Sequence, residues 1–125
     1  MVLPPDIRNW GFCLIDVDAM DMNDFVRVNR LSYKKYIDEY SDFFGEWNDE
    51  VAINAFRCKM RLSFFGKLIL NDEAVGFLNY DVKENAIDDI SITIIETAQN
   101  KGIGSFFLSY LIKSSNEMGK PIDLF

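Results

Sequence analysis

Two glycines stand in the short polar segment Gln99-Asn100-Lys101-Gly102-Ile103-Gly104, between a run of β-branched residues and a stretch with helical spacing. Glycine has no Cβ, so Gly102 and Gly104 let a ligand approach the main chain closely. The first turn of a helix also presents N–H groups without partners, and the helix dipole adds positive potential there. Lys101 contributes a full positive charge. The segment therefore predicts an anion site that suits a pyrophosphate.

The spacing Gly-x-Gly at the start of a helix is also typical of ordinary turns. It is not the dinucleotide-binding fingerprint, because the third glycine and the acidic residue after the next strand are missing. It is not a P-loop either, because no Gly-Lys-Ser/Thr follows. The surrounding elements must decide between a turn and a ligand site.

Hydrophobic patterning predicts those elements. We expect a first strand around residues 12–17, then a helix that Asp21 caps and that Phe43-Phe44-Gly45 ends. A second helix is capped by Asn48 or Asp49.

Three strands should follow at about 64–70, 74–82 and 87–95, with polar turns at Asn71-Asp72 and at 83–85. A helix over about 102–118 should stop at Gly119, and Pro121 should start a last strand. The order β-α-α-β-β-β-α-β indicates one α/β (α+β) domain over residues 1–125, with a mixed, mostly antiparallel sheet flanked by helices.

Composition excludes several classes of site and protein. The 125 residues carry a formal net charge of -7 and no dense Lys/Arg run, which argues against nucleic-acid binding. Because the chain has no histidine, zinc sites with histidine ligands and histidine-based triads are excluded, and no metal is expected. Cys13 and Cys58 are expected as free, buried thiols. Without a visible signal peptide or an apolar run of roughly 20 residues, we expect a cytoplasmic protein that does not span a membrane.

The chain resembles the GNAT superfamily of acyl-coenzyme A-dependent N-acetyltransferases. The family signature Q/R-x-x-G-x-G/A is present as Gln99-x-x-Gly102-x-Gly104, and Glu73-Ala74-Val75-Gly76-Phe77 looks like the family's E-x-V-G-F strand. Tyr36-Ile37-x-Glu39-Tyr40 and Phe44-Gly45-x-Trp47 resemble the region between the first two helices of one bacterial branch. Together these segments place the resemblance over about residues 10–125.

The resemblance implies acetyl-coenzyme A as co-substrate. It places the main chain of Ile92, Thr93 and Ile94 against the pantetheine arm, and an amide among them as the donor that polarises the thioester carbonyl. It also implies that amides from the loop surround the pyrophosphate, from Gln99, Asn100, Lys101, Gly102, Ile103, Gly104 and Ser105. The side chains of Ile92 and Ile94 are equally typical of a core, and both readings are compatible.

Direct transfer needs a base for the acceptor ammonium. Asp88 falls where some members of the family carry a glutamate, although it and the adjacent Asp89 also fit solvated carboxylates at a strand entry. Glu39, Glu46 and Tyr80 are further candidates.

The family pattern normally continues into a helix whose tyrosine protonates the leaving thiolate, so the resemblance implies a domain incomplete at its C-terminus. Tyr110 is expected to pack in the core instead. An open edge at 121–125 would favour a homodimer.

Three functions stay open at this point. One is transfer of an acetyl group to a primary amine of a small molecule, peptide or protein. The second is a coenzyme A-binding but catalytically impaired domain that acts as a sensor or as an interaction or dimerisation module. The third is a structural dimerisation domain that binds no ligand.

Overall fold

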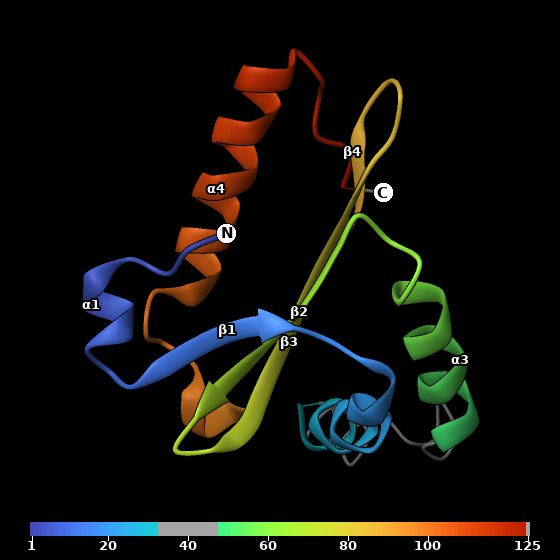
Figure 1. Cartoon of the computed structure of the whole chain (residues 1–125), viewed down its shortest axis with the longest axis vertical. Helices are drawn as coiled ribbons and strands as arrows, with labels where there is room; N and C mark the ends of the chain where they lie inside the picture. The colour runs from blue at the N-terminus through green and yellow to red at the C-terminus, as the bar shows by residue number, and fades with distance from the viewer. Residues whose placement is uncertain (33–47, 125) are drawn as a thin grey trace, which may run out of the picture.

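The computed structural model describes residues 1–32 and 48–124. Four strands form one antiparallel sheet in the order in which they occur along the chain (Figure 1). They are β1 (Phe12–Asp16), β2 (Phe64–Leu70), β3 (Glu73–Val82) and β4 (Ile87–Ile94). The three predicted strands of the meander are confirmed to within one residue at each end.

The turn between β2 and β3 confirms the hairpin signal at Asn71-Asp72. Both residues have positive φ, 53° and 63°, as a two-residue turn of type I′ requires. Asparagine and aspartate tolerate this region better than other non-glycine residues. The turn sets the register at its end, where Leu70 pairs with Glu73.

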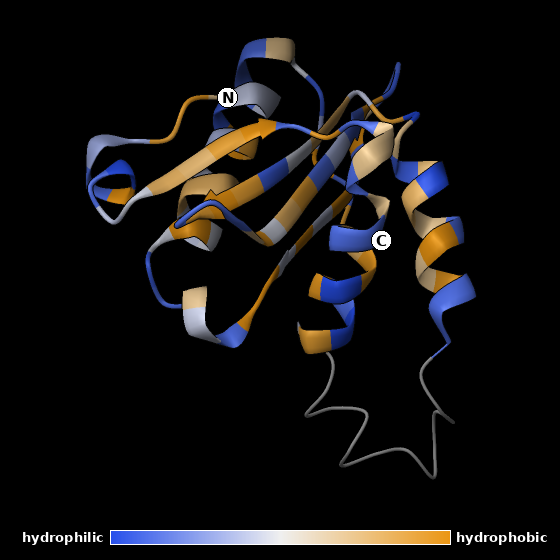
Figure 2. Ribbon diagram, turned by 60° about the horizontal axis from the view of Figure 1, so that its bottom comes forward, coloured by the Kyte–Doolittle hydropathy of each residue, from blue (hydrophilic) through white to orange (hydrophobic). Residues whose placement is uncertain are grey.

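Helices cover both faces of the sheet, as expected for this fold class. α4 (Ile103–Met118) packs on one face, where Leu78, Phe107 and Leu111 belong to one buried cluster. α3 (Asp49–Lys59) and the helical residues 22–32 pack on the other face (Figure 1). Figure 2 shows these two helices side by side, with alternating hydrophobic and hydrophilic colour along the strands beside them.

The second face is held by an aromatic cluster. Phe25 lies with its ring centroid 5.4 Å from that of Phe56 and 5.2 Å from that of Phe77, the latter edge to face. All three are at most 3% exposed. Such pairs contribute beyond the area they bury, which ties both helices to the sheet.

Helix ends follow the predicted chemistry in two places. The Asn48 side chain accepts a hydrogen bond from the Glu50 N–H at 2.9 Å and so caps α3. Gly119 ends α4 in the left-handed region, with φ 65°. The prediction of a cap at Asp21 is wrong. Asp18 caps the 3-10 turn η1 (Ala19–Asp21), while Asp21 is buried and pairs with Lys67.

The N-terminal segment contains a short helix that the sequence did not indicate, α1 (Pro5–Arg8). Pro5 occupies its first turn, where a missing N–H has no cost. Leu3 and Ile7 are buried in the cluster beneath α4.

The predicted last strand is reduced, among the described residues, to one parallel bridge between Ile87 and Ile122. The Ile87 N–H donates to the Pro121 carbonyl at 2.9 Å, and the Asp123 N–H donates to the Ile87 carbonyl at 2.8 Å. Beyond Ile87, no described strand pairs with the outer edge of β4.

The prediction of buried thiols is also wrong, because Cys13 and Cys58 are both free and exposed. Cys13 alternates with Phe12 and Leu14, which belong to the cluster under α4, so its side chain points to the other face of an edge strand. The two motifs over 36–47, together with Glu39, Glu46 and Phe43-Phe44-Gly45, lie outside the described residues. Within the described ranges, no helix has the length and hydropathy needed to cross a membrane.

Candidate functional site

The glycine segment connects β4 to α4 through the 3-10 turn η2 (Glu96–Ala98). Asn100 has φ 62° and Gly102, the N-cap of α4, has φ 82°. No side chain caps this helix, and its first internal hydrogen bond runs from the Phe106 N–H to the Gly102 carbonyl at 3.0 Å. The N–H groups of residues 103–105 therefore lack partners within the helix, as an anion site requires.

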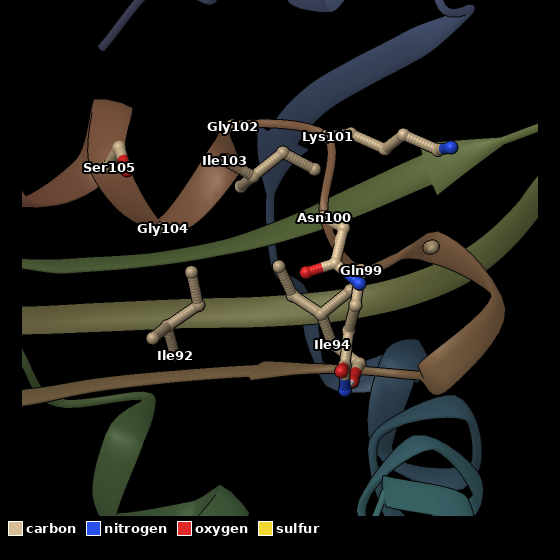
Figure 3. A pocket seen from close by; sticks show the side chains of 10 residues that line it. Ile92, Ile94, Gln99, Asn100, Lys101, Gly102, Ile103, Gly104 and Ser105 are labelled. Atoms are coloured by element: carbon tan, nitrogen blue, oxygen red, sulfur yellow. Dashed lines mark hydrogen bonds between the residues drawn. The ribbon is translucent and has the colours of Figure 1, made fainter.

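A pocket of about 370 Å³ opens at this helix end. A Cβ added at Gly102 or Gly104 would meet no atom within 4 Å, so neither glycine is required by packing. Figure 3 shows the side chains of Ile92 and Ile94 directed from β4 toward the loop. The pocket is lined by Ile92, Ile94, Ala98, Gln99, Asn100, Lys101, Gly102, Ile103, Gly104 and Ser105.

Thr93 is the one predicted cofactor-binding residue that does not line this pocket. It pairs with Phe77, and successive side chains of a strand point to opposite faces, so Thr93 points to the side of α3. Ala98, which is 1% exposed, also lines the pocket, although no sequence pattern around it indicated a ligand.

The main chain of β4 presents polar groups along its outer edge. The Ile95 N–H donates to the Val75 carbonyl at 2.9 Å, so Ile95 faces β3. Main-chain groups of an antiparallel strand alternate in direction, and Thr93 therefore faces β3 while Ile92 and Ile94 face outward. The Ile94 carbonyl accepts a hydrogen bond from Gln99 Nε2 at 2.8 Å. Gln99 thus holds the loop against the edge of β4.

Lys101 is held by an aromatic ring from the N-terminal segment. Its Nζ lies 4.2 Å from the ring centroid of Trp10. In Figure 3 the Lys101 side chain extends away from Gly104 and Ser105. Trp10, which is 59% exposed, was not identified from the sequence, because only tertiary structure places it beside the loop.

Asp88, the predicted base, lies at the start of β4 and does not line this pocket. Its carboxylate is 3.0 Å from Lys83 Nζ, and Asp89 is 3.2 Å from the same nitrogen. Hydrogen bonds to the two aspartates raise the pKa of Lys83. Asp81 also approaches this cluster, with carboxylate oxygens of the three residues within 4.8 Å of one another.

Tyr80 lies in the layer between the sheet and α4. Its ring centroid is 5.2 Å from that of Phe64 and 6.2 Å from that of Tyr110. Burial raises the pKa of the Tyr80 phenol, and a hydrogen bond with Tyr110 adds to the rise. The raised pKa keeps the phenol neutral, so Tyr80 does not supply an ionised base at neutral pH. Tyr110 packs in the same aromatic layer.

A second pocket, of about 380 Å³, lies on the opposite face of β4 against α3. Sequence reasoning missed it, because its polar side chains come from separate elements. Lys59 Nζ donates to Asn79 Oδ1 at 2.7 Å and to Ser91 Oγ at 2.8 Å.

No protein-family model matches the chain. No curated protein matches it either. Solved structures do match. A candidate acetyltransferase from Pyrococcus horikoshii superposes with a TM-score of 0.67 at 17% identity, over 90% of this chain and 37% of that protein. The ribosomal-protein-S18-alanine N-acetyltransferase of Escherichia coli superposes with 0.58 at 14% identity, over 86% of this chain and 61% of the enzyme.

A GNAT family acetyltransferase from Brucella melitensis, solved in complex with acetyl-CoA, superposes with a TM-score of 0.56 at 11% identity. That match covers 87% of this chain and 71% of the other. The chain spans less than two thirds of the length of the first two proteins. At these identities the similarity concerns the backbone arrangement, and the chain has the fold of the GNAT acetyltransferases.

Proposed function

We propose that the protein is an acetyl-coenzyme A-dependent N-acetyltransferase that acts on a primary amine. The observation that carries this proposal is the open glycine loop at the start of α4, with three N–H groups that have no partner within the helix. The loop lies beside the edge of β4 that no described strand covers beyond Ile87. One end suits a pyrophosphate and the other suits an extended, amide-bearing chain. Coenzyme A has both parts.

Different residues would bind the pyrophosphate and the pantetheine arm of coenzyme A. The N–H groups of residues 103–105 would hold the pyrophosphate, and Lys101, whose ammonium lies over the Trp10 ring, would add positive potential at the loop. The outward main-chain groups of Ile92, together with the Ile94 N–H, would pair with the amides of the pantetheine arm as an added strand does. The Ile94 carbonyl is already engaged by Gln99. An N–H of this edge is also placed to polarise the thioester carbonyl, which makes its carbon more reactive toward an amine.

Gly104→Trp tests the loop. Gly104 is exposed and its φ is not in the left-handed region, so a large side chain can be accommodated by the fold while it fills the pocket. We expect calorimetry to show a loss of coenzyme A binding, with an unchanged unfolding transition. Asn116→Trp, on the exposed far end of the same helix, is the matched control and should bind as the unaltered protein does.

Thiol release from acetyl-coenzyme A over a panel of primary amines tests the activity. Unaltered binding in Gly104→Trp would remove the loop from the site. Absence of both binding and turnover in the unaltered chain would refute the proposal.

One observation favours binding without catalysis as the second candidate. The residues that line the loop pocket include no acidic, tyrosine or cysteine side chain, so none of them is an evident proton acceptor. Tight coenzyme A binding with no thiol release across the amine panel would support a sensor or interaction module instead.

A further inference from the structure

The second pocket lies across β4 from the coenzyme loop, between that strand and α3. It is lined by Ala55, Cys58, Lys59, Leu62, Asn79, Asp89, Ile90 and Ser91. In Figure 3, α3 lies on the side of β4 opposite to the loop and to the Ile92 side chain. The two pockets therefore flank one strand.

A closed hydrogen-bond network holds a cation at the helix side of this pocket. Lys59 Nζ donates to Asn79 Oδ1 and to Ser91 Oγ, and the Ser91 hydroxyl donates to the same Asn79 oxygen. Asn79 is 3% exposed, and its Nδ2 donates to the Asp89 carbonyl. An ammonium has three N–H donors, so Lys59 keeps one for a ligand. Burial lowers the pKa of Lys59, and the charge of Asp89 partly offsets this effect.

A carboxylate stands at the strand side of the same pocket. Between the pairs Asn79–Ser91 and Asp81–Asp88 the register shifts, and β4 carries one extra residue. Asp89 lies in this bulge with φ 51°, and its side chain is 53% exposed. Lys83 Nζ lies 3.2 Å from one carboxylate oxygen of Asp89. Because a carboxylate accepts about four hydrogen bonds, Asp89 can still accept hydrogen bonds from a ligand.

The strand side of the pocket is also the side nearest the edge that would carry the thioester. Ser91 lines this pocket and Ile92, the next residue, lines the other. No described strand covers the outer edge of β4 between Asp89 and Ile94. A ligand that places its amine at Asp89 thus lies beside an edge that no described strand covers.

We propose that this pocket binds the acceptor, and that the acceptor is a small zwitterion with its ammonium at Asp89 and an acid group at Lys59. This inference rests on the proposed function and specifies its substrate class. In the transfer, the ammonium loses one proton and its nitrogen bonds to the thioester carbonyl carbon. The C–S bond breaks, the sulfur leaves as thiolate, and the new amide nitrogen loses a second proton. The thiolate takes up one proton, so one proton is released for each amide formed.

Matched acceptors measure the contribution of the acid group. Glycine, β-alanine and 4-aminobutanoate are compared with methylamine, ethylamine and propylamine, which lack only the carboxylate. We expect the best amino acid to have a KM roughly tenfold or more below that of its matched amine, the size of one charge-assisted hydrogen bond. Equal KM values for all three pairs would overturn the proposal.

Lys59→Met should remove that preference while coenzyme A binding stays unchanged, and Lys59→Arg should restore it in part. Lys113→Met, at an exposed lysine of α4 outside both pockets, is the matched control and should keep the preference. A Lys59→Met protein that raises KM for amines and amino acids alike would contradict recognition of an acid group.

Cys58 offers a readout that needs no turnover, because it is exposed and lines the pocket, and Cys13 is the only other thiol. In a Cys13→Ser protein, the preferred amino acid should slow N-ethylmaleimide modification of Cys58, whereas its matched amine should not. In a Cys58→Ser protein, Cys13 should react with N-ethylmaleimide at the same rate with the amino acid, with the amine and with neither. Protection without turnover would uphold the pocket and refute transfer. Absence of protection at saturating amino acid would refute the pocket even in an active enzyme.

Discussion

The side-chain amide of Gln99 donates to the main-chain carbonyl of Ile94 across a distance of 2.8 Å. This bond joins the first residue of the glycine segment to the free edge of β4. It fixes the loop relative to the strand before any ligand arrives, which reduces the ordering that binding must otherwise impose.

Gln99→Ala should weaken coenzyme A binding more than it weakens the fold. The bond is exposed, so its loss should lower the free energy of unfolding by only about 0.5–1 kcal/mol. Calorimetry should show a larger loss in affinity, since the loop is no longer held against β4. Asn116→Ala, which removes an exposed amide from α4, serves as the control. A stability loss with unchanged affinity would show that the bond serves the fold alone.

Lys101→Met should distinguish the pyrophosphate from the rest of the ligand. We expect coenzyme A to bind roughly fivefold or more weakly, whereas pantetheine, which has no pyrophosphate, keeps its affinity. Trp10→Leu should act in the same direction but more weakly, because it removes only the ring beneath the ammonium. Competition measurements with both ligands give the two ratios. Equal losses for both ligands would place Lys101 elsewhere than at the phosphates.

Breaking the ion pair of Asp21 and Lys67 should destabilise the fold more than breaking a surface pair does. Their side chains are 7% and 16% exposed, and Asp21 also accepts the Asp18 N–H. Asp21→Ala leaves a lysine buried without its partner, and urea unfolding should show a loss of about 3 kcal/mol. Asp24→Ala, which breaks the exposed pair with Arg27, should cost less than about 1 kcal/mol.

The double variant Asp21→Ala/Lys67→Met provides the check on this interpretation. It should recover part of the loss, because no uncompensated charge remains buried. If the double variant instead loses as much stability as Asp21→Ala and Lys67→Met lose together as single variants, the two side chains do not depend on each other.

The lowered pKa of Lys59 gives a pH dependence with a definite sign. At pH values between this lowered pKa and 10.5, the unfolded chain binds more protons at this residue than the folded chain does. Stability attributable to Lys59 therefore rises as pH increases through that window. Urea unfolding from pH 7 to 10.5 should show that the free energy of unfolding of the unaltered protein increases relative to that of Lys59→Met as pH rises. A constant difference between the two would show that burial does not perturb this lysine.

Much of the sheet could be predicted because its signals are local. The turn Asn71-Asp72 needs two positive φ angles, and β-branched residues from Ile90 to Ile95 favour an extended backbone. Gly119 likewise marks a helix end by its own conformational freedom. None of these depends on distant parts of the chain, so composition and spacing are sufficient.

What could not be predicted depends on contacts between distant residues. Nothing near Lys59 in the sequence indicates that Asn79 and Ser91 will bind its ammonium. Asp89 carries no signal for a left-handed bulge, because that conformation follows from the strand pairing around it. The exposure of Cys13 similarly follows from its place on an edge strand. The loop pocket could therefore be predicted from the sequence, whereas the second pocket could not.

The alternating direction of the β4 main chain has a consequence for the exchange of its amide hydrogens with solvent. The N–H groups of Ser91 and Thr93 face β3, whereas those of Ile92 and Ile94 face the uncovered edge. Along four consecutive residues, exchange into deuterated water should therefore be slow, fast, slow and fast. An extended ligand laid along this edge would protect the two fast positions and leave the slow ones as they were.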